Sequence, residues 1–270
     1  MTIRVFNSKE TALPSEFRVR IEAIKNDFAN GSTVIARNTL KLLTDAVNYI
    51  DESNKKIILD LAVELLSSKP HMTAPTNILN IFINEYPGFS TKSEMVNFLI
   101  KLESGLNLAS DSCVALANDK LFKKEKTSIL TCSYSSTVYN IISKTNSDII
   151  VYVLQSIWNG IDYSEIWRAQ LKVLNIKCYV LSEDDIIPEI DFGLLGADAV
   201  LYSGDVLNGA PSLYLAQSLK KIGIPLLVVA ESFKKCKESP ISDGFELIPA
   251  GLITEIITDN IRDTFKFNKK

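Results

Sequence analysis

The spacing of apolar residues changes near residue 120. Up to that point they recur at helical intervals, as in STVIARNTLKLLTDAVNYI and ESNKKIILDLAVELLSS, a spacing that predicts amphipathic helices with one buried face. Ser32 stands at the head of the first run and is its predicted N-cap. The pattern continues through KSEMVNFLIKLESGLNLASDSCVALANDKLF, after the breaker pair Pro87-Gly88. Residues 1–120 are therefore predicted to form a helical N-terminal domain.

Beyond residue 125 the apolar residues gather in short runs instead. The runs are KTSILT, SDIIVYVL, IKCYVLS, AVLYS and IPLLVVA, and each is typical of a strand that is buried on both faces. The stretches between them are long enough for helices, as the crossovers of a parallel sheet require. The sequence thus predicts an α/β protein whose second part, residues 121–270, is a doubly wound parallel sheet domain.

In such a sheet, ligands bind outside the carboxyl ends of the strands, so the residues after each run form the candidate site. The first of these segments extends from Cys132 to Thr137 and precedes the predicted helix VYNIISK. Hydroxyls and free backbone N–H groups meet there at a helix N-terminus, an arrangement that suits an anion such as phosphate. The alternative interpretation is that these serines cap the helix.

The segment GADAVLYSGDVLNGAPSLYLAQSLKK carries the most chemical information. The pattern predicts a Gly-rich turn, a strand, a second turn with Asp205 and Asn208, and a helix that Pro211 starts. Asp205 could exchange a proton or bind a sugar hydroxyl. Asp and Asn are also ordinary turn formers, which leaves a structural role open for both residues. Asp198 is expected to stabilise its own turn.

Length and composition limit the functional classes. A chain of 270 residues is long enough for two domains, and 46% hydrophobic with 23% charged residues is typical of a globular protein. A net charge of -3 gives no overall attraction to nucleic acids or acidic membranes. The four cysteines lie far apart without a C-x-x-C pair, so we expect no metal site, no disulfides and a cytoplasmic location. We also expect no signal peptide and no membrane span.

Several motifs together resemble one protein family. GADAVLYSGDVLN, IPLLVVAESFK and FELIPAGLITEIITDNI look like the alpha, beta and delta regulatory subunits of translation initiation factor two-B. The related isomerases of methylthioribose 1-phosphate and ribose 1,5-bisphosphate share this signature. Upstream, ILTCSYSSTV and NGSTVIARNTLKLL are similar to family motifs as well, so the resemblance covers residues 20–260.

The resemblance implies a Rossmann-like fold for the second domain and a homodimer that pairs through it. It also implies a protein partner in translation initiation and a phosphorylated metabolite as ligand. We expect no cofactor, because no G-x-G-x-x-G follows any strand, which disfavours dinucleotide-dependent redox chemistry.

The catalytic residues of the isomerases are only partly retained. These enzymes use a cysteine two places after the threonine of I-L-T-H-C, together with the aspartate of N-G-D-V. By resemblance the aspartate is Asp205, whereas the cysteine position holds Ser133. Cys132 lies next to it, but adjacent residues of a strand point to opposite faces. The candidate catalytic residues are therefore Asp205, Ser133 and Cys132, although a serine hydroxyl needs a base to become reactive.

Two further motifs of the family are altered. N-K-x-G is here Asn208-Gly209-Ala210-Pro211, which lacks the lysine, and E-S-R-P is reduced to a segment around Gln155-Ser156, which lacks the arginine. Both missing cations could neutralise a phosphate. We expect Ser133 and the three hydroxyl residues after Tyr134 to face Asp205 and Asn208 across the sheet edge. The expected ligand-binding residues are Ser135, Ser136, Thr137, Gln155, Ser156, Gly204, Asn208 and Lys234.

Two hypotheses about function follow from these matches and departures. The first is an initiation factor two-B-like regulatory or interaction protein, whose sugar-phosphate- or nucleotide-sized pocket has lost its chemistry. The alternative is a sugar-phosphate aldose–ketose isomerase in which Asp205 moves the proton and Ser133 or Cys132 takes the partner role. The intact Asp205 favours the isomerase, whereas Ser133 and Gly209 oppose it.

Overall fold

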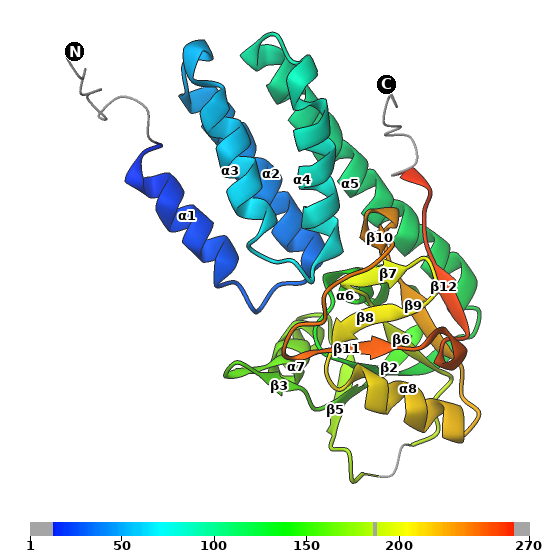
Figure 1. The fold of residues 1–270 in the computed structure, drawn as a ribbon. Coiled ribbons are helices and arrows are strands. Elements are labelled where there is room, and N and C mark those ends of the chain that lie inside the picture. Colours follow the sequence, from blue (N-terminus) through cyan, green and yellow to red (C-terminus); the bar gives the residue numbers. More distant parts are fainter. Residues whose placement is uncertain (1–12, 186–187, 262–270) are drawn as a thin grey trace, which may run out of the picture.

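The computed structural model describes residues 13–185 and 188–261, and its first half is helical as predicted (Figure 1). Ser32 does not cap its helix. The helix begins at Ser32 itself, because Gly31 adopts the extended backbone that an N-cap position requires. None of the helices in the described chain combines the length and the hydropathy needed to cross a bilayer. The helices and 3-10 turns of this half are α1 (Ser15–Lys25), α2 (Ser32–Tyr49), η1 (Glu52–Asn54), α3 (Lys56–Leu66), α4 (Thr73–Glu85), η2 (Tyr86–Gly88) and α5 (Lys92–Leu121).

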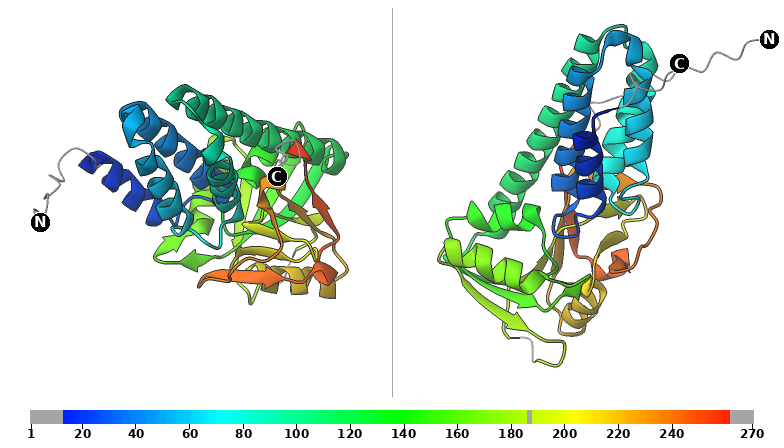
Figure 2. Two further views of the ribbon diagram at one scale, coloured as in Figure 1. Left: turned by 45° about the horizontal axis from the view of Figure 1, so that its top comes forward. Right: turned by 90° about the vertical axis from the view of Figure 1, so that its left-hand side faces the viewer.

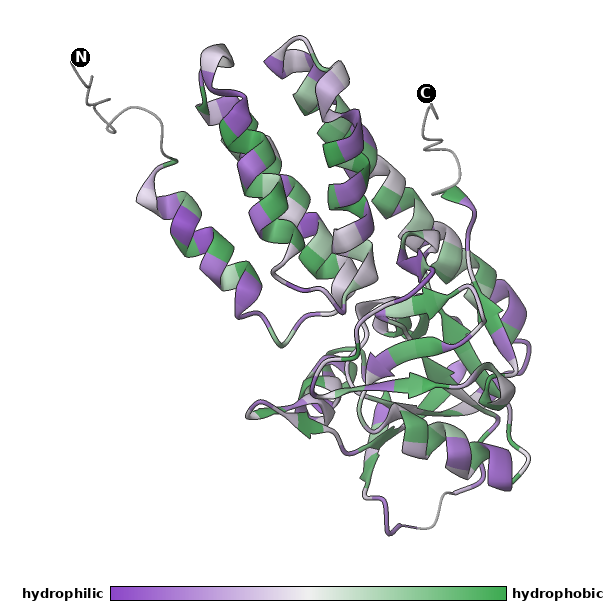
Figure 3. Ribbon diagram, viewed as in Figure 1, coloured by the Kyte–Doolittle hydropathy of each residue, from purple (hydrophilic) through white to green (hydrophobic). Residues whose placement is uncertain are grey.

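Along the helices of the first half, apolar positions recur every three to four residues among polar ones, which Figure 3 shows as green and purple segments on the same helix. On α2 the residues Ile35, Leu40 and Leu43 are at most 1% exposed and pack in the core between the helices. The start of α5 is fixed by a capping box, in which Thr91 Oγ1 accepts from Glu94 N–H and the Glu94 carboxylate accepts from Thr91 N–H. The helical core thus follows from the spacing of the apolar residues.

Six parallel strands form the central sheet of the second half. Their spatial order is β5-β2-β1-β6-β9-β12, and every neighbouring pair is parallel. Numbered along the chain, this is the order 3-2-1-4-5-6 of a Rossmann-like sheet, so the predicted fold is confirmed. The order reverses between β1 and β6, where folds of this kind bind ligands. The strands are β1 (Lys126–Cys132), β2 (Asp148–Leu154), β5 (Lys177–Leu181), β6 (Phe192–Leu195), β9 (Leu226–Val229) and β12 (Glu255–Ile257).

Helices cover both faces of this sheet (Figure 2). α6 (Ser136–Ser143) and α7 (Tyr163–Val173) pack on one face, where Trp167 is fully buried. α8 (Ser212–Lys221) covers the other face through Leu215 and Leu219. The central strands β1, β6 and β9 are therefore buried between these layers, as their apolar composition predicts, whereas the edge strand β5 stays partly exposed, with Tyr179 50% exposed.

The helix α5 belongs to both halves of the molecule. Its first part places Leu99 and Leu106 in the core between the helices. Its last turns place Cys113 and Ala117 in the core on the α6 and α7 face of the sheet. One continuous helix of 30 residues therefore joins the two domains.

A smaller, four-stranded sheet corrects one strand prediction. The run AVLYS was expected in the parallel sheet, but β7 pairs antiparallel with β8 across a short turn and lies in the order β10-β7-β8-β11. The strand that takes its place is β6, which the apolar pattern missed because Gly193 interrupts it. A Cβ at Gly193 would lie 2.2 Å from Leu219 Cδ1, so a larger residue there would displace the leucine side chains with which α8 packs on β6. The remaining elements are β3 (Ile157–Trp158), β4 (Ile161–Asp162), β7 (Ala199–Leu201), β8 (Val206–Gly209), η3 (Ser232–Lys234), β10 (Lys235–Cys236), β11 (Phe245–Ile248) and η4 (Ala250–Leu252).

Candidate functional site

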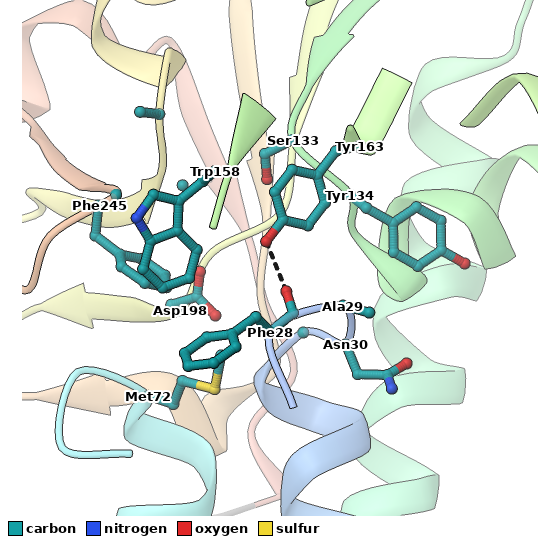
Figure 4. A pocket seen from close by; sticks show the side chains of 14 residues that line it. Phe28, Ala29, Asn30, Met72, Ser133, Tyr134, Trp158, Tyr163, Asp198 and Phe245 are labelled. Atoms are coloured by element: carbon teal, nitrogen blue, oxygen red, sulfur yellow. Dashed lines mark hydrogen bonds between the residues drawn. The ribbon is translucent and has the colours of Figure 1, made fainter. Parts of the chain in front are cut away.

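A cleft lies where the two domains meet, at the reversal of strand order (Figure 4). Ser133 and Tyr134 follow β1, and Asp198 follows β6, so both sides of the reversal contribute to it. The loop between α1 and α2 reaches it from the helical domain with Phe28 and its neighbours. The cavity volume is about 40 Å³, and the space reaches about 400 Å³ only when open solvent is included. A ligand in this cleft would contact both domains.

Aromatic rings form much of the cleft wall. The ring centroids of Phe28 and Trp158 lie 5.1 Å apart with planes at 84°, and those of Trp158 and Phe245 lie 5.7 Å apart at 73°. Rings at these distances and angles contact one another edge to face, and Figure 4 shows Phe28, Trp158 and Phe245 grouped together on one side of the cleft. The Tyr163 hydroxyl donates a 2.6 Å hydrogen bond to the Phe28 carbonyl. This bond ties the α1–α2 loop to the start of α7.

Trp158 is held in place by its hairpin and by a glycine. The turn residues Asn159 and Gly160 have φ values of 49° and 76°, which suits the two-residue turn between β3 and β4. A Cβ at Gly244 would lie 2.4 Å from the indole ring, so the ring packs directly on the glycine backbone. The indole N–H lies 3.5 Å from Asp243 Oδ2, so its polar edge points away from the other rings.

Asp198 gives the cleft its charge. Its side chain is only 8% exposed, and burial raises the pKa of Asp198 to about 6, although the Lys234 ammonium and the Ser32 amide act in the opposite direction. The backbone of Asp198 is fixed, because its N–H donates to Leu207 O (2.8 Å) and its carbonyl accepts from Thr73 N–H (3.0 Å). In the described part of the chain Asp198 forms no ion pair, and no lysine or arginine lines the cleft.

A second polar group at the domain junction is closed to solvent. Glu231 is fully buried, and its carboxylate pairs with Lys234 Nζ at 2.8 Å. It also accepts hydrogen bonds from the hydroxyls of Thr33 (3.1 Å) and Thr137 (3.0 Å). Burial opposes its ionisation, yet the Lys234 ammonium holds the pKa of Glu231 below its usual value. We call Thr33, Thr137, Glu231 and Lys234 the junction cluster.

Of the predicted site residues, all of which lie in the described chain, only Ser133 lines the cleft. Its φ of 51° lies in the left-handed region. A Cβ on Gly209 would lie 3.0 Å from Ser133 Oγ, so the position that the resemblance gives to a lysine lies against Ser133. Cys132 is buried in the core beneath α8, where its Sγ lies 3.5 Å from Ser212 Oγ. Burial raises the pKa of the Cys132 thiol to about 12.

Asp205 and Asn208 do not line the cleft. Asp205 lies in the turn between β7 and β8, where its carboxylate accepts from Ala250 N–H (2.8 Å) and from the Ser203 hydroxyl (2.9 Å). Asn208 is buried and donates to Ser212 Oγ at 2.7 Å. Because β7 and β8 form a separate hairpin, the end of β8 nearest the cleft is Gly209 and not Asp205. The structure therefore does not place Asp205 and Ser133 on one wall.

The other predicted ligand-binding residues have local partners. Ser135 caps α6, since its Oγ accepts from Val138 N–H at 3.3 Å, and Ser136 follows in the first turn. Thr137 and Lys234 belong to the junction cluster. Gln155 is exposed, whereas Ser156 is buried and donates to the Ala210 carbonyl. Gly204 has a φ of 90° in the β7–β8 turn. For Ser135 the capping interpretation is the one that its hydrogen bond supports.

The aromatic residues of the cleft were not predicted from the sequence, and Asp198 was predicted to have only a structural role. The pair Asn159-Gly160 was the visible signal for Trp158, because Asn-Gly favours a two-residue hairpin turn. Phe28 and Met72 come from the helical domain, so the rule of strand ends could not find them. Within residues 13–185 and 188–261, no three His, Cys, Asp or Glu side chains gather closely enough to hold a metal ion.

A helical domain joined to a Rossmann-like sheet, with a cleft where they meet, defines a class of two-domain α/β proteins. Within that class the chain belongs to the Initiation factor 2 subunit family, whose model matches residues 29–246. The translation initiation factor eIF2B subunit alpha of Dictyostelium discoideum is 24% identical over 262 residues, which cover 94% of this chain and 75% of the relative. The ribose 1,5-bisphosphate isomerase of Archaeoglobus fulgidus is 22% identical over 224 residues, with coverage of 79% and 70%.

Solved structures of the family share the fold. The Pyrococcus horikoshii translation initiation factor eIF-2B superposes with a TM-score of 0.80 at 19% identity, covering 91% of this chain and 96% of that one. A chain of the tetrameric eIF2B-beta2-delta2 complex from Chaetomium thermophilum gives a TM-score of 0.69 at 17% identity, with coverage of 90% and 88%. Proteins named as initiation factor subunits and one named as an isomerase thus both occur among the relatives.

Proposed function

We propose that this chain is a regulatory or interaction protein of the family, with a metabolite-sized cleft and without isomerase chemistry. The observation that carries the proposal is the composition of the cleft wall next to Ser133. The positions that the resemblance gives to a cysteine and a lysine are Ser133 and Gly209, and both lie at the cleft. The thiol that would share in proton transfer and the cation that would bind the phosphate are therefore absent from these two positions.

Proton transfer also lacks suitable partners. Interconversion of an aldose and a ketose needs groups that exchange a proton at neutral pH, and such a group contributes about 10²–10⁴-fold to the rate. The thiol of Cys132 is unsuited, because it is buried behind the strand with its pKa raised to about 12. Asp205 is engaged by the Ala250 amide and the Ser203 hydroxyl. These contacts support a structural role for Asp205.

The partners that we propose are proteins of the translation initiation machinery in the cytoplasm, together with a second copy of this chain. Members of the family form oligomeric complexes. Apolar side chains around the four-stranded sheet support pairing through the C-terminal domain, since Tyr202 is 70% and Ile241 is 59% exposed. Light scattering at micromolar concentration should report a dimer, and a clean monomer mass would contradict the pairing.

An isomerase assay separates this proposal from its alternative, which the Archaeoglobus fulgidus relative favours. We expect no turnover of ribose 1,5-bisphosphate or methylthioribose 1-phosphate by the purified chain. We expect Ser133→Cys to create at most weak activity, because Gly209 still supplies no cation for the phosphate. Turnover that collapses in Asp205→Asn would establish the isomerase and overturn the proposal.

A further inference from the structure

We propose that Asn159 is a site of spontaneous deamidation, and that this reaction alters the wall of the cleft beside Trp158. The reaction is independent of the proposed function. The sequence contains three Asn-Gly pairs, at residues 30–31, 159–160 and 208–209. Glycine after asparagine favours deamidation, because it has no side chain that shields its backbone nitrogen. Of the three pairs, the one at Asn159 has both of its reacting groups free in the described chain.

The reaction is a ring closure followed by hydrolysis. The Gly160 backbone nitrogen attacks Cγ of the Asn159 side chain, so that a new N–C bond forms while the bond from Cγ to the side-chain nitrogen breaks. That nitrogen leaves as ammonia and takes up the proton that the Gly160 nitrogen loses. Water then opens the resulting succinimide at either carbonyl, which gives aspartate or isoaspartate. One water is consumed and one ammonia is released, without any transfer of electrons.

The turn between β3 and β4 leaves both reacting groups accessible. Asn159 and Gly160 are exposed, and in the described part of the chain neither the Asn159 side chain nor the Gly160 N–H has a hydrogen-bond partner. A Cβ at Gly160 would meet nothing within 4 Å, so the space beside the attacking nitrogen is open. Ring closure needs rotation of the Asn159 backbone, and only two residue pairs hold the hairpin. A hairpin this short opens locally at little cost.

The other two Asn-Gly pairs are held by hydrogen bonds. The Asn30 side chain donates to Asp27 Oδ2 at 2.9 Å, and its backbone N–H donates to Asp27 Oδ1 at 3.0 Å. Asn208 is 5% exposed and its side chain donates to Ser212 Oγ at 2.7 Å, while Gly209 lies in the ladder between β8 and β11. Each hydrogen bond that must break slows the reaction by about 2- to 10-fold. Asn30 should therefore react slowly, and Asn208 should react slowest.

Deamidation at this turn changes the cleft wall through the hairpin. An aspartate fits the two-residue turn, since Asp-Gly is one of the pairs that favour it. An isoaspartate instead passes the backbone through its side chain and adds one carbon to the turn. The turn then no longer matches the ladder between β3 and β4, in which Trp158 pairs with Ile161 beside the turn. Trp158 contacts Phe28 and Phe245 (Figure 4), so its displacement reaches the cleft.

Ageing of the full chain at neutral pH, followed by peptide mass spectrometry, tests the assignment. Deamidation raises the mass of a peptide by about 1 Da, because an amide NH2 is replaced by OH, and fragment spectra assign the change to one asparagine. We expect Asn159 to react at least about 2- to 10-fold faster than Asn30, with the smallest conversion at Asn208. In the chain unfolded by guanidinium chloride the three sites should react at similar rates, because each is followed by the same residue and the folded surroundings are gone.

Two variants separate the reaction from its effect on the cleft. Asn159→Gly has no side chain that closes the ring and keeps a turn that tolerates positive φ, so its tryptophan emission should stay constant during ageing. Asn159→Asp, measured fresh, carries the added charge without the longer backbone and should have nearly the emission of the fresh unmodified chain. The emission of the unmodified chain should shift during ageing, in step with its isoaspartate fraction.

Each measurement has a result that contradicts the proposal. Modification of Asn30 or Asn208 ahead of Asn159 in the folded chain would overturn the assignment of the site. An Asn159 that reacts in the unfolded chain and stays intact in the folded chain would show that the hairpin protects it. If Asn159 is modified and the emission of the unmodified chain changes no more than that of Asn159→Gly, the effect on the cleft is refuted.

Discussion

Glu231 and Asp198 are both buried carboxylates at the domain junction, yet their surroundings differ. Glu231 has an ammonium and two hydroxyls around it, and its pKa lies below the usual value. Asp198 lies on a cleft wall without an ion-pair partner in the described chain, and its pKa is raised to about 6. The carboxylate of Glu231 is closed off by its partners, whereas that of Asp198 lies at the cleft wall and is opposed only by the Ser32 amide and the more distant charge of Lys234.

The difference shows how a structural carboxylate can be told from a binding carboxylate without knowledge of the ligand. A buried polar group that has all of its partners fixes the fold, because its removal leaves those partners unsatisfied. A buried carboxylate with a perturbed pKa at a cleft is a candidate for function. Two substitutions test this distinction, and a third tests how the cleft wall is held.

Glu231→Ala should have the largest effect. It leaves the buried Lys234 ammonium without its counter-charge and two hydroxyls without their acceptor, so the free energy of unfolding should fall by about 3–5 kcal/mol. Denaturant unfolding measures the change. Glu64→Ala is the control, because Glu64 pairs with Lys25 at the surface and should cost at most about 1 kcal/mol. Similar losses in both variants would contradict the structural role of the junction cluster.

Asp198→Asn should change stability in the opposite direction. The folded state holds the Asp198 proton more tightly, with a pKa of about 6 against an ordinary 3.8. The unmodified chain therefore loses stability relative to the variant as the pH rises through 6. At pH values above that, Asp198→Asn should be more stable by about 2–3 kcal/mol, and at about pH 4 the two should converge.

Unfolding in urea across that pH range provides the measurement. A difference between the two proteins that stays constant with pH would show that Asp198 does not carry an unbalanced charge.

Gly244→Ala should have a smaller effect that is centred on the cleft. Gly244 has a φ of 78°, which costs an alanine about 1–2 kcal/mol, and the new Cβ would displace the Trp158 indole. We expect a loss of about 2 kcal/mol together with a shifted tryptophan emission. Gly251→Ala is the matched control, because a Cβ there meets nothing within 4 Å and its φ is ordinary. An unchanged emission in Gly244→Ala would show that the indole is not held by this contact.

The fold could be predicted from the sequence to a greater extent than the site. The apolar spacing located the helical half and five runs that form strands. Burial of one face gives a helical spacing of apolar residues, and burial of both faces gives a short continuous apolar run. The pattern missed β6, where Gly193 packs against Leu219. It also placed AVLYS in the wrong sheet, since pairing partners are not encoded in a single run.

The candidate site depends on contacts between distant parts of the chain, which a pattern does not contain. Phe28 and Trp158 meet at 5.1 Å although 130 positions separate them in the sequence. The resemblance pointed to the turn with Ser133, and Ser133 lines the cleft. It could not reveal that Asp205 would bind the Ala250 amide, because that contact depends on how the β7–β8 hairpin folds back on η4.

The length of α5 has a consequence for how the molecule unfolds. A helix of 30 residues spans about 45 Å, and it supplies side chains first to one core and then to the other. If either core unfolds, the other core loses the side chains that α5 contributes to it. We therefore expect the helical half and the sheet half to unfold cooperatively. A fragment that starts at residue 121 would lack Cys113, Val114 and Ala117, and its sheet would be left with an open apolar face. We therefore expect the helical half and the sheet half of the chain to unfold together in one transition.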